Sequence, residues 1–151
     1  MKQLTIFNSP EFGNIRSYLD KLGEPWFCLN DVCRCLGLGN PSQVKTQLKG
    51  EGCLSNEVST TVIAHGKPTG KFKAMKMTFI SEGNLYRCVF NSRKPAAQAF
   101  QDWVCQEVLP SIRAHGVYAT PNFLDRCLED PDFAIEAIQR MKTERERKRL
   151  Q

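Results

Sequence analysis

The sequence predicts an α+β fold, with a small antiparallel sheet and hairpins packed with about four to five short helices, plus a C-terminal helical tail. The N-terminal third contains short β-leaning runs separated by turn residues, and two more such runs lie between residues 57 and 80. Elsewhere, apolar residues recur at three- and four-residue steps beside recognisable helix caps. The segment after Tyr118 has a helical pattern and is rich in charge.

A chain of 151 residues is long enough for one domain with its own core and a short appendage. We place the domain at residues 1–118 and assign residues 119–151 to a linker and a charged helical tail. Hydrophobic residues make up 41% and charged residues 25%, as in soluble globular proteins. Apolar runs such as "WFCL" are far shorter than the roughly 18 residues of a membrane span, and the N-terminus has no apolar signal core, which predicts a cytoplasmic protein without a membrane partner.

The seven cysteines are odd in number, include no CxxC pair and accompany two histidines, so they predict neither a disulfide framework nor a zinc finger. In a reducing compartment most of them are expected to be small buried hydrophobic residues. The alternative is a soft-metal site at "CRC", Cys33 to Cys35, with Cys28 nearby. We expect no metal and no cofactor.

The first strands are expected at "LTIF", "IRSYL" and "PWFCL", the last two joined in a hairpin through Gly23 and Pro25. A short helix follows, which Asn30 is expected to cap and Gly37 to end. Asn40 and Pro41 then predict the start of a second helix.

The second helix, from Pro41 to Lys49, forms a helix-turn-helix-like pair with the first. Its polar residues lie off the buried stripe of Val44 and Leu48, where they can meet phosphates or base edges. The alternative is an ordinary solvated face. The residues predicted to contact nucleic acid are Ser42, Gln43, Lys45, Thr46 and Lys49.

Two β-leaning runs, "EVSTTVIAH" and "KFKAMKMTFI", surround "GKPTG" and predict a hairpin with a basic tip. From His65 to Lys76 there is no acidic residue. A helix pair followed by such a hairpin resembles winged nucleic-acid binders, in which the loop contacts phosphates. The alternative is an exposed sheet edge kept soluble by lysine. The predicted phosphate contacts are Lys67, Lys71 and Lys73.

Ser81 and Ser92 are each expected to cap a helix. Arg93 and Lys94 would then stand at a helix N-terminus, where cations oppose the helix dipole. An acidic partner such as DNA is one explanation for these two residues, and a tolerated surface charge is the other.

The stretch "AFQDWVCQEVLPSIRAHGVY" has helical spacing on both sides of Pro110. A proline inside a helix costs about 3 kcal/mol, so the helix is expected to stop or bend near Leu109. Pro110 would open a further turn that Gly116 ends. We interpret the stretch as a bent core helix in which Trp103 and Ile112 are buried.

Catalysis is not predicted, because the sequence has no G-x-S-x-G, P-loop, HExxH or EF-hand pattern. The lone acids are explained by capping and solvated charge. They are Asp31, Glu82, Asp102 and Glu107. We therefore predict a non-enzymatic binding module.

The tail, after a linker "ATPNF", has opposite charges four residues apart, as in Glu144 and Lys148, which support an exposed helix. Ile135, Ile138 and Met141 could begin a coiled coil and so a homo-oligomer, although they fill too few heptads to establish one.

Two stretches resemble the Bro-N domain of phage and prophage antirepressors and of the Bro proteins of large DNA viruses. The first, "EPWFCLNDVCRCLGLGN", places the family's W-F-x-x-x-D-V-x-x-x-L-G pattern on residues 26–37. The second, "ISEGNLYRCVFNSRKPAAQAFQDWVCQEVLPSIRAHGVY", matches the S-R-K-P…W-V-x-x-E-V-L-P pattern from Ser92 onward. The resemblance covers residues 3–118. The sequence departs from the family pattern in two ways. Asn84 stands between Gly83 and Leu85, where the family usually has G-L-Y without an intervening residue. Cysteines also occupy several positions that are usually aliphatic.

The resemblance implies an α+β DNA-binding domain of a viral regulator in the cytoplasm of a bacterial host cell, commonly followed by a coiled coil and another domain. Similar antirepressors relieve repression of lytic genes, in several cases by contacting a repressor protein. Two hypotheses stay open: a module that binds DNA through the residues named above, and a protein-interaction module that binds and inactivates a phage repressor without contacting DNA. The motif residues Trp26, Trp103, Leu109 and Pro110 are expected in the core and turns.

Overall fold

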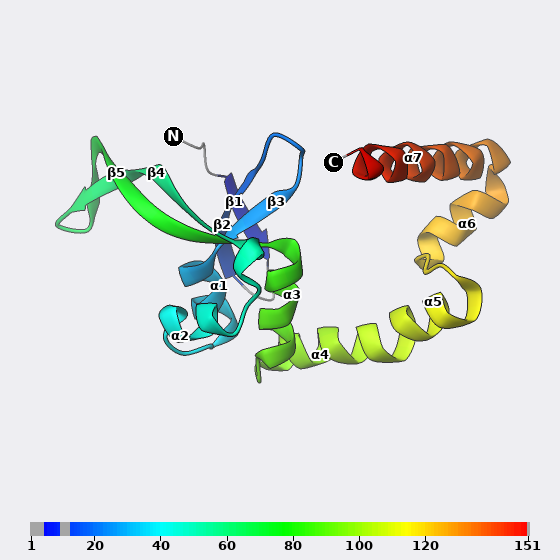
Figure 1. Ribbon diagram of the computed structural model, residues 1–151, viewed down its shortest axis with the longest axis horizontal. Coiled ribbons are helices and arrows are strands. Elements are labelled where there is room, and N and C mark those ends of the chain that lie inside the picture. The colour runs from blue at the N-terminus through cyan, green and yellow to red at the C-terminus, as the bar shows by residue number, and fades with distance from the viewer. Residues whose placement is uncertain (1–4, 10–12, 151) are drawn as a thin grey trace. The chain divides into compact units, whose positions relative to one another are not determined.

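The computed structural model describes residues 5–9 and 13–150, and the chain divides into two compact units, residues 1–104 (unit 1) and 105–151 (unit 2) (Figure 1). Unit 1 contains a five-stranded antiparallel sheet with strand order β1-β2-β3-β5-β4. The strands are β1 (Thr5–Ser9), β2 (Gly13–Leu19), β3 (Pro25–Cys28), β4 (Cys53–Ala64) and β5 (Lys67–Ser81). The predicted α+β class, with a small antiparallel sheet, is confirmed.

The core of unit 1 has a cluster on each face of the sheet. On one face, Ile15 of β2 and Ile80 of β5 pack with Val32 of α1 (Leu29–Leu36) and Val89 of α3 (Glu82–Asn91). On the opposite face, the buried residues are Tyr18, Cys28, Val58, Met77 and Phe79. Since strand side chains alternate between faces, neighbours such as Phe79 and Ile80 join different clusters.

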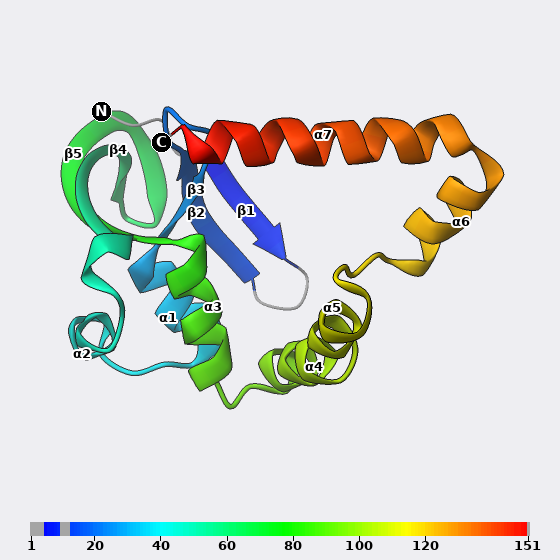
Figure 2. The same cartoon turned by 45° about the vertical axis from the view of Figure 1, so that its right-hand side comes forward.

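The long hairpin of β4 and β5 extends beyond the other strands and curls, as Figure 2 shows. Two-stranded ribbons twist more strongly than wider sheets. Its base supplies Val58 and Met77 to the second core cluster. The far half of the hairpin, from residue 63 to residue 76, is exposed along both strands.

Four cysteines of unit 1 lie in these clusters, which confirms that they are buried hydrophobic residues: Cys28, Cys33, Cys35 and Cys88. Burial raises the pKa of Cys88 to about 12, so its thiol stays protonated at neutral pH. Among the described residues, no group of three or more His, Cys, Asp or Glu side chains could hold a metal ion.

Helix α1 begins at Leu29, two residues earlier than a cap at Asn30 indicates, so the predicted cap is wrong: Cys28 occupies the N-cap and supplies no side-chain hydrogen bond. The predicted end is confirmed, since Gly37 has a φ of 66°, a left-handed conformation that glycine adopts without a steric penalty.

Asp31 was predicted to be a solvated or capping acid, and this prediction is wrong. Its side chain is 3% exposed, and its Oδ2 lies 2.7 Å from Nε of Arg16. Arg16 also donates to the Asp31 carboxylate from its backbone N and from Nη2, and Nη1 of Arg34 lies 3.3 Å from Asp31 Oδ1. Burial opposes ionisation of Asp31, but the hydrogen bonds and charge of Arg16 outweigh it and hold the pKa of Asp31 below its usual value. The ion pair joins β2 to the first turn of α1.

Helix α2 (Pro41–Thr46) begins as predicted, because the side chain of Asn40 accepts a hydrogen bond from Ser42 N and Pro41 occupies the first turn. The predicted extension of this helix to Lys49 is wrong. The buried Asn84 side chain accepts from the backbone N of Lys49 and donates to its carbonyl, at 3.2 and 3.0 Å. These bonds hold Lys49 in an extended conformation.

Asn84 also donates to Gly52 O at 2.9 Å, at the end of a 3-10 turn (Gly50–Gly52). A Cβ on Gly52 would lie 2.5 Å from Asn84 Nδ2 and from Ser81 Oγ. The departure from the family pattern at Asn84 therefore has a structural explanation: this amide fastens the turn before β4 to the start of α3.

Replacing Gly52 by alanine is expected to destabilise unit 1 by about 1–3 kcal/mol, because the added methyl group displaces the Asn84 amide. Urea unfolding followed by circular dichroism measures the change. Gly50→Ala is the matched control, since a Cβ there meets nothing within 4 Å. Equal stability of the two variants would contradict the packing described here.

The side chain of Ser81 caps α3 as predicted, accepting from Asn84 N. Ser92 does not cap the next helix. Its hydroxyl donates to Leu36 O at 2.6 Å, and Lys94 holds the N-cap position of α4 (Pro95–Trp103). Pro95 occupies the first turn of α4, so that turn has one fewer unpaired N–H.

A π-helical turn (Val104–Val108) separates α4 from α5 (Leu109–His115). Pro110 lies in the first turn of α5 and Gly116, with a φ of 78°, ends it, as predicted. The wider spacing of a π turn accommodates a proline without an α-helical hydrogen bond. The interpretation as a core helix is wrong for this region, because Trp103, Leu109 and Ile112 are 40%, 53% and 45% exposed.

In unit 2, α5 is followed by α6 (Pro121–Glu129) and α7 (Pro131–Arg149). Thr120 caps α6 and Asp130 caps α7, so the tail helix starts at Pro121, within the predicted linker "ATPNF", and the tail is divided into two helices at Asp130. Phe123 and Phe133 hold the two helices together, with ring centroids 5.5 Å apart. The predicted pair of Glu144 and Lys148 is present at 3.7 Å. Within residues 5–9 and 13–150, no helix is both long and apolar enough to cross a membrane.

Candidate nucleic-acid interface

The net positive charge of the chain belongs to unit 1. Residues 1–104 contain thirteen Lys and Arg against eight Asp and Glu, whereas residues 105–151 contain eight of each. The formal charge of +5 is thus the charge of unit 1 alone. A basic module attached to a neutral tail suits a polyanion that binds unit 1.

The most basic segment of unit 1 is the far half of the β4–β5 hairpin. Ala64 pairs with Lys67 across a two-residue turn, and both turn residues, His65 and Gly66, have positive φ values of 52° and 77°. This is the conformation of a type I′ hairpin turn. The predicted turn at "GKPTG" is therefore placed too late, and Lys67 already belongs to β5.

The predicted hairpin lysines, Lys67, Lys71 and Lys73, are exposed on β5, and so is Lys76. Residues 62–76 contain no acid, while Glu57 lies opposite Lys76 in the strand register. Cross-strand neighbours of opposite charge attract, so the positive field is strongest beyond Lys76, toward the turn.

The predicted helix residues form a second exposed group on and just after α2: Ser42, Gln43, Lys45, Thr46 and Lys49. A helix of six residues spans about 9 Å, too short to present the two turns of an ordinary recognition helix. The Thr46 hydroxyl donates to Gln43 O at 2.6 Å. Burial raises the pKa of the Cys53 thiol, and the positive charge of Lys45 nearby opposes this rise. This group offers phosphate contacts more readily than base readout.

The third group, Arg93 and Lys94, is exposed between α3 and α4. The side chain of Lys94 crosses Gly37, its Cε lying 3.1 Å from where a Cβ of Gly37 would stand. Gly37 is the C-cap of α1. The aliphatic part of the Lys94 side chain therefore packs over the end of α1, which the sequence analysis did not identify.

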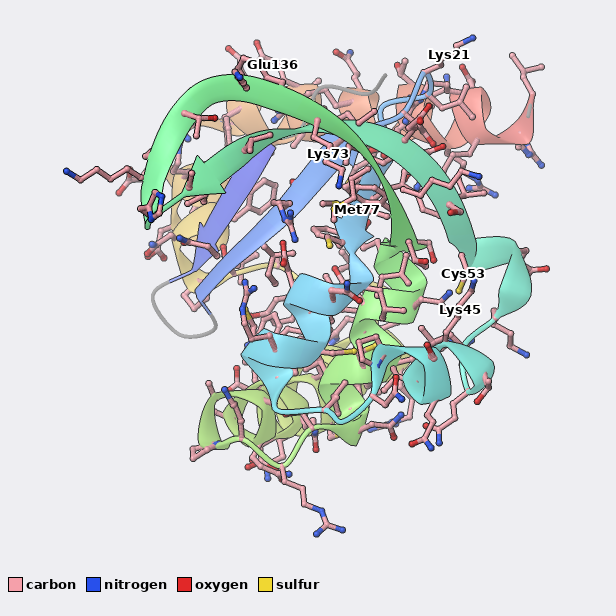
Figure 3. The ribbon with its side chains drawn as sticks, turned by 90° about the vertical axis from the view of Figure 1, so that its left-hand side faces the viewer. Lys21, Lys45, Cys53, Lys73, Met77 and Glu136 are labelled. Atoms are coloured by element: carbon pink, nitrogen blue, oxygen red, sulfur yellow. The ribbon has the colours of Figure 1, made fainter. Side chains whose placement is uncertain are left out.

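Figure 3 shows where the hairpin and α2 lie within unit 1. Lys73 is on the arched part of β5, and Lys45 is on α2 beside Cys53, lower in the view. The hairpin and α2 both lie on the side of unit 1 that faces the viewer, with α1 between them in this view. The arrangement provides two separate basic elements on one side of the unit.

A groove of about 480 Å³ elsewhere in unit 1 has the opposite charge. Its lining includes Trp26 and Tyr86, together with four carboxylates: Asp20, Glu24, Glu51 and Glu82. Asp20 accepts from the indole Nε1 of Trp26 at 3.0 Å. The carboxylates repel phosphate, so a nucleic acid would avoid this groove.

Sequence reasoning missed two features of the candidate interface. Phe72, between two of the predicted lysines, is 72% exposed. Its place in "KFK" gave a signal, because an aromatic residue flanked by lysines is typical of nucleic-acid contacts. The side chain of Asn84, which sets the backbone at Lys49, gave no such signal, since its bonds join residues more than 30 positions apart.

Comparison with known proteins identifies related sequences. The BRO family, N-terminal domain (Bro-N), matches residues 14–110. An uncharacterised protein of Haemophilus influenzae is 39% identical over 116 residues, which cover 77% of this chain and 53% of that protein. The Bro-N domain-containing protein 201R of Invertebrate iridescent virus 6 is 31% identical over 117 residues, covering 70% of this chain and 28% of that protein.

A third relative, the Bro-N domain-containing protein 019R of Invertebrate iridescent virus 3, is 29% identical over 147 residues, covering 85% of this chain and 36% of that protein. This chain thus spans about half the length of the bacterial relative and about a third of the two viral ones. No solved structure matches the chain. The family match spans β2 to the beginning of α5, nearly two thirds of the chain, and so the chain belongs to the BRO family by its N-terminal Bro-N domain.

Proposed function

We propose that this chain is a DNA-binding module of a viral or prophage transcription regulator of the antirepressor type, without enzymatic activity. The observation that supports it most is the acid-free hairpin segment of residues 62–76, exposed from residue 63 onward, on a unit with five excess positive charges. Phosphate contacts provide most of the affinity of nucleic-acid binders, and exposed lysines at the end of a projecting ribbon can reach them without a steric obstacle.

The helix α2 group adds a second contact in this proposal. Lys45 of α2 lies on the same side of unit 1 as the hairpin, so a duplex that meets one element can meet the other. The module works in the cytoplasm of the bacterial host, needs no cofactor, and positions itself on DNA through charge. Unit 2, which is neutral, contributes little to this binding and offers its helices for homo-oligomer formation.

Fluorescence anisotropy of a labelled mixed-sequence duplex, titrated with the whole chain over a salt series, tests the proposal. The logarithm of the association constant is expected to fall linearly with the logarithm of salt concentration, with a slope of about −0.9 for each phosphate neutralised. Absence of binding at low salt would refute DNA binding.

An exposed aromatic cluster favours a second candidate function, binding and inactivation of a repressor protein. Phe100 is flanked by Trp103, Phe90 and Tyr86, with ring centroids 5.7, 6.5 and 6.1 Å away. Tyr86, Phe90 and Trp103 are each at least 40% exposed. Aromatic side chains are enriched in protein interfaces. Co-elution of the purified chain with its cognate phage repressor, in the absence of DNA, is the result that this candidate predicts.

A further inference from the structure

Phe72 is the most exposed aromatic side chain for which the structure gives a value, at 72%, and neither core cluster, as far as the described side chains define them, includes a residue from 63 to 76. Its partner across the ribbon is Thr61, beside a register shift between Thr61 and Ile63. Ile63 is itself 65% exposed. Large apolar side chains this exposed bury little of their surface within unit 1, so most of that surface is available for a partner.

The strand alternation separates Phe72 from the lysines next to it. Lys71 and Lys73 point to one face of the ribbon and Phe72 to the other, because successive side chains of a strand alternate. A two-stranded ribbon fits in a groove of duplex DNA. When its aromatic face meets the base pairs, the flexible lysine side chains of the opposite face extend sideways to the phosphates that border the groove.

We propose that the hairpin lies in a groove of duplex DNA and that Phe72 inserts against the base pairs as an apolar wedge. This inference rests on the proposed function and adds the role of one residue to it. The charge of the four hairpin lysines selects DNA as the occupant of this apolar face, since a polyanion is the partner that residues 62–76 complement. Apolar wedges of this kind unstack a base step and bend the duplex.

Phe72→Ala in the whole chain is the test, with anisotropy on a mixed-sequence duplex over a salt series. Loss of an aromatic contact with a base is expected to weaken binding about tenfold at each salt concentration and to leave the salt slope unchanged, because no phosphate contact is lost. The matched control is Met75→Ala, which removes an exposed apolar side chain from the opposite face of the same strand. This control is expected to change affinity by less than about threefold.

Phe72→Trp supplies an independent readout. Stacking against bases is expected to quench the added indole fluorescence when DNA binds, beyond any change seen in the parent chain with Trp26 and Trp103. If Phe72→Ala binds DNA as tightly as the parent chain, or if Phe72→Trp shows no added quenching, the role of Phe72 is overturned while the proposed function stays in place. Tighter binding to a single strand than to the duplex would overturn the placement in a groove. Failure of the parent chain to bind DNA would overturn both proposals.

Discussion

Replacing Asp31 by asparagine is expected to lower the free energy of unfolding by about 3 kcal/mol, the low end of the range for breaking a buried ion pair. The low end applies because the Arg16 side chain is 34% exposed and regains water when its partner loses charge. Because asparagine has nearly the same volume as aspartate, the lost free energy of unfolding comes from the missing charge and the weakened hydrogen bonds from Arg16. Urea unfolding measures it.

The control for this substitution is Asp102→Asn, on the exposed surface of α4, which is expected to change stability by less than about 0.5 kcal/mol. Equal effects of the two substitutions would show that the ion pair of Asp31 and Arg16 does not stabilise the junction of β2 and α1.

The same ion pair determines a pH dependence. The pKa of Asp31 is lowered in the folded protein, so its contribution is fully present above the unfolded value, about 3.9, and disappears as the pH falls toward the folded value. The parent chain is therefore expected to lose stability below about pH 4 more steeply than Asp31→Asn. Parallel stability curves for the two proteins between neutral pH and pH 3 would contradict the lowered pKa.

Reversing two charges on the hairpin is expected to have the largest effect on DNA binding. Lys71→Glu combined with Lys73→Glu removes two cations and adds two anions where the ribbon is proposed to meet phosphates. Affinity is expected to fall at least about a hundredfold at low salt, with a salt slope reduced by about 2. Both residues are exposed, so the thermal unfolding of the double variant is expected to match the parent.

The matched control reverses Lys142 and Arg145, two exposed cations of α7. It changes the net charge of the chain by the same amount but leaves unit 1 intact. A large loss of affinity in both double variants would mean that DNA responds to the overall charge of the chain, not to the hairpin.

Local signals in the sequence predicted a good part of unit 1. The alternation in "KFKAMKMTFI" predicted a half-buried strand, and Met77 and Phe79 are indeed buried. The caps at Asn40 and Ser81 were also predicted, because an N-cap bond joins residues close together in the chain. The same holds for Gly37, whose left-handed conformation depends on local geometry.

The errors arose where a distant residue decides the local structure. Helix α2 ends before Lys49 because Asn84, 35 positions later, binds both of its backbone groups. Ser92 donates to Leu36 O, 56 positions earlier, and so is not a helix cap. Asp31 is buried beside Arg16 of β2, 15 positions earlier, which forms an ion pair with it. None of these partners follows from periodicity or capping patterns, which describe neighbours within a few residues.

The candidate interface was predicted by charge alone. The lysines of the hairpin are exposed, as the acid-free run from His65 to Lys76 indicated. The sequence did not predict that the hairpin curls out from the sheet, because the length of β4 and β5 beyond their pairing with β3 is a property of the topology. Lys94 shows the limit of the charge argument, since its side chain packs over Gly37 at the end of α1.

Hydrogen–deuterium exchange of the whole chain, with and without a mixed-sequence duplex, tests the central claim most directly. The claim is that the basic hairpin of unit 1 contacts DNA. Exchange is expected to slow on DNA addition in peptides covering residues 62–76 and, to a smaller extent, residues 41–49, and to stay unchanged in α6 and α7. Unchanged exchange in the hairpin, with slowing confined to α3 and α4 or to the tail helices, would contradict the claim and assign binding to another surface.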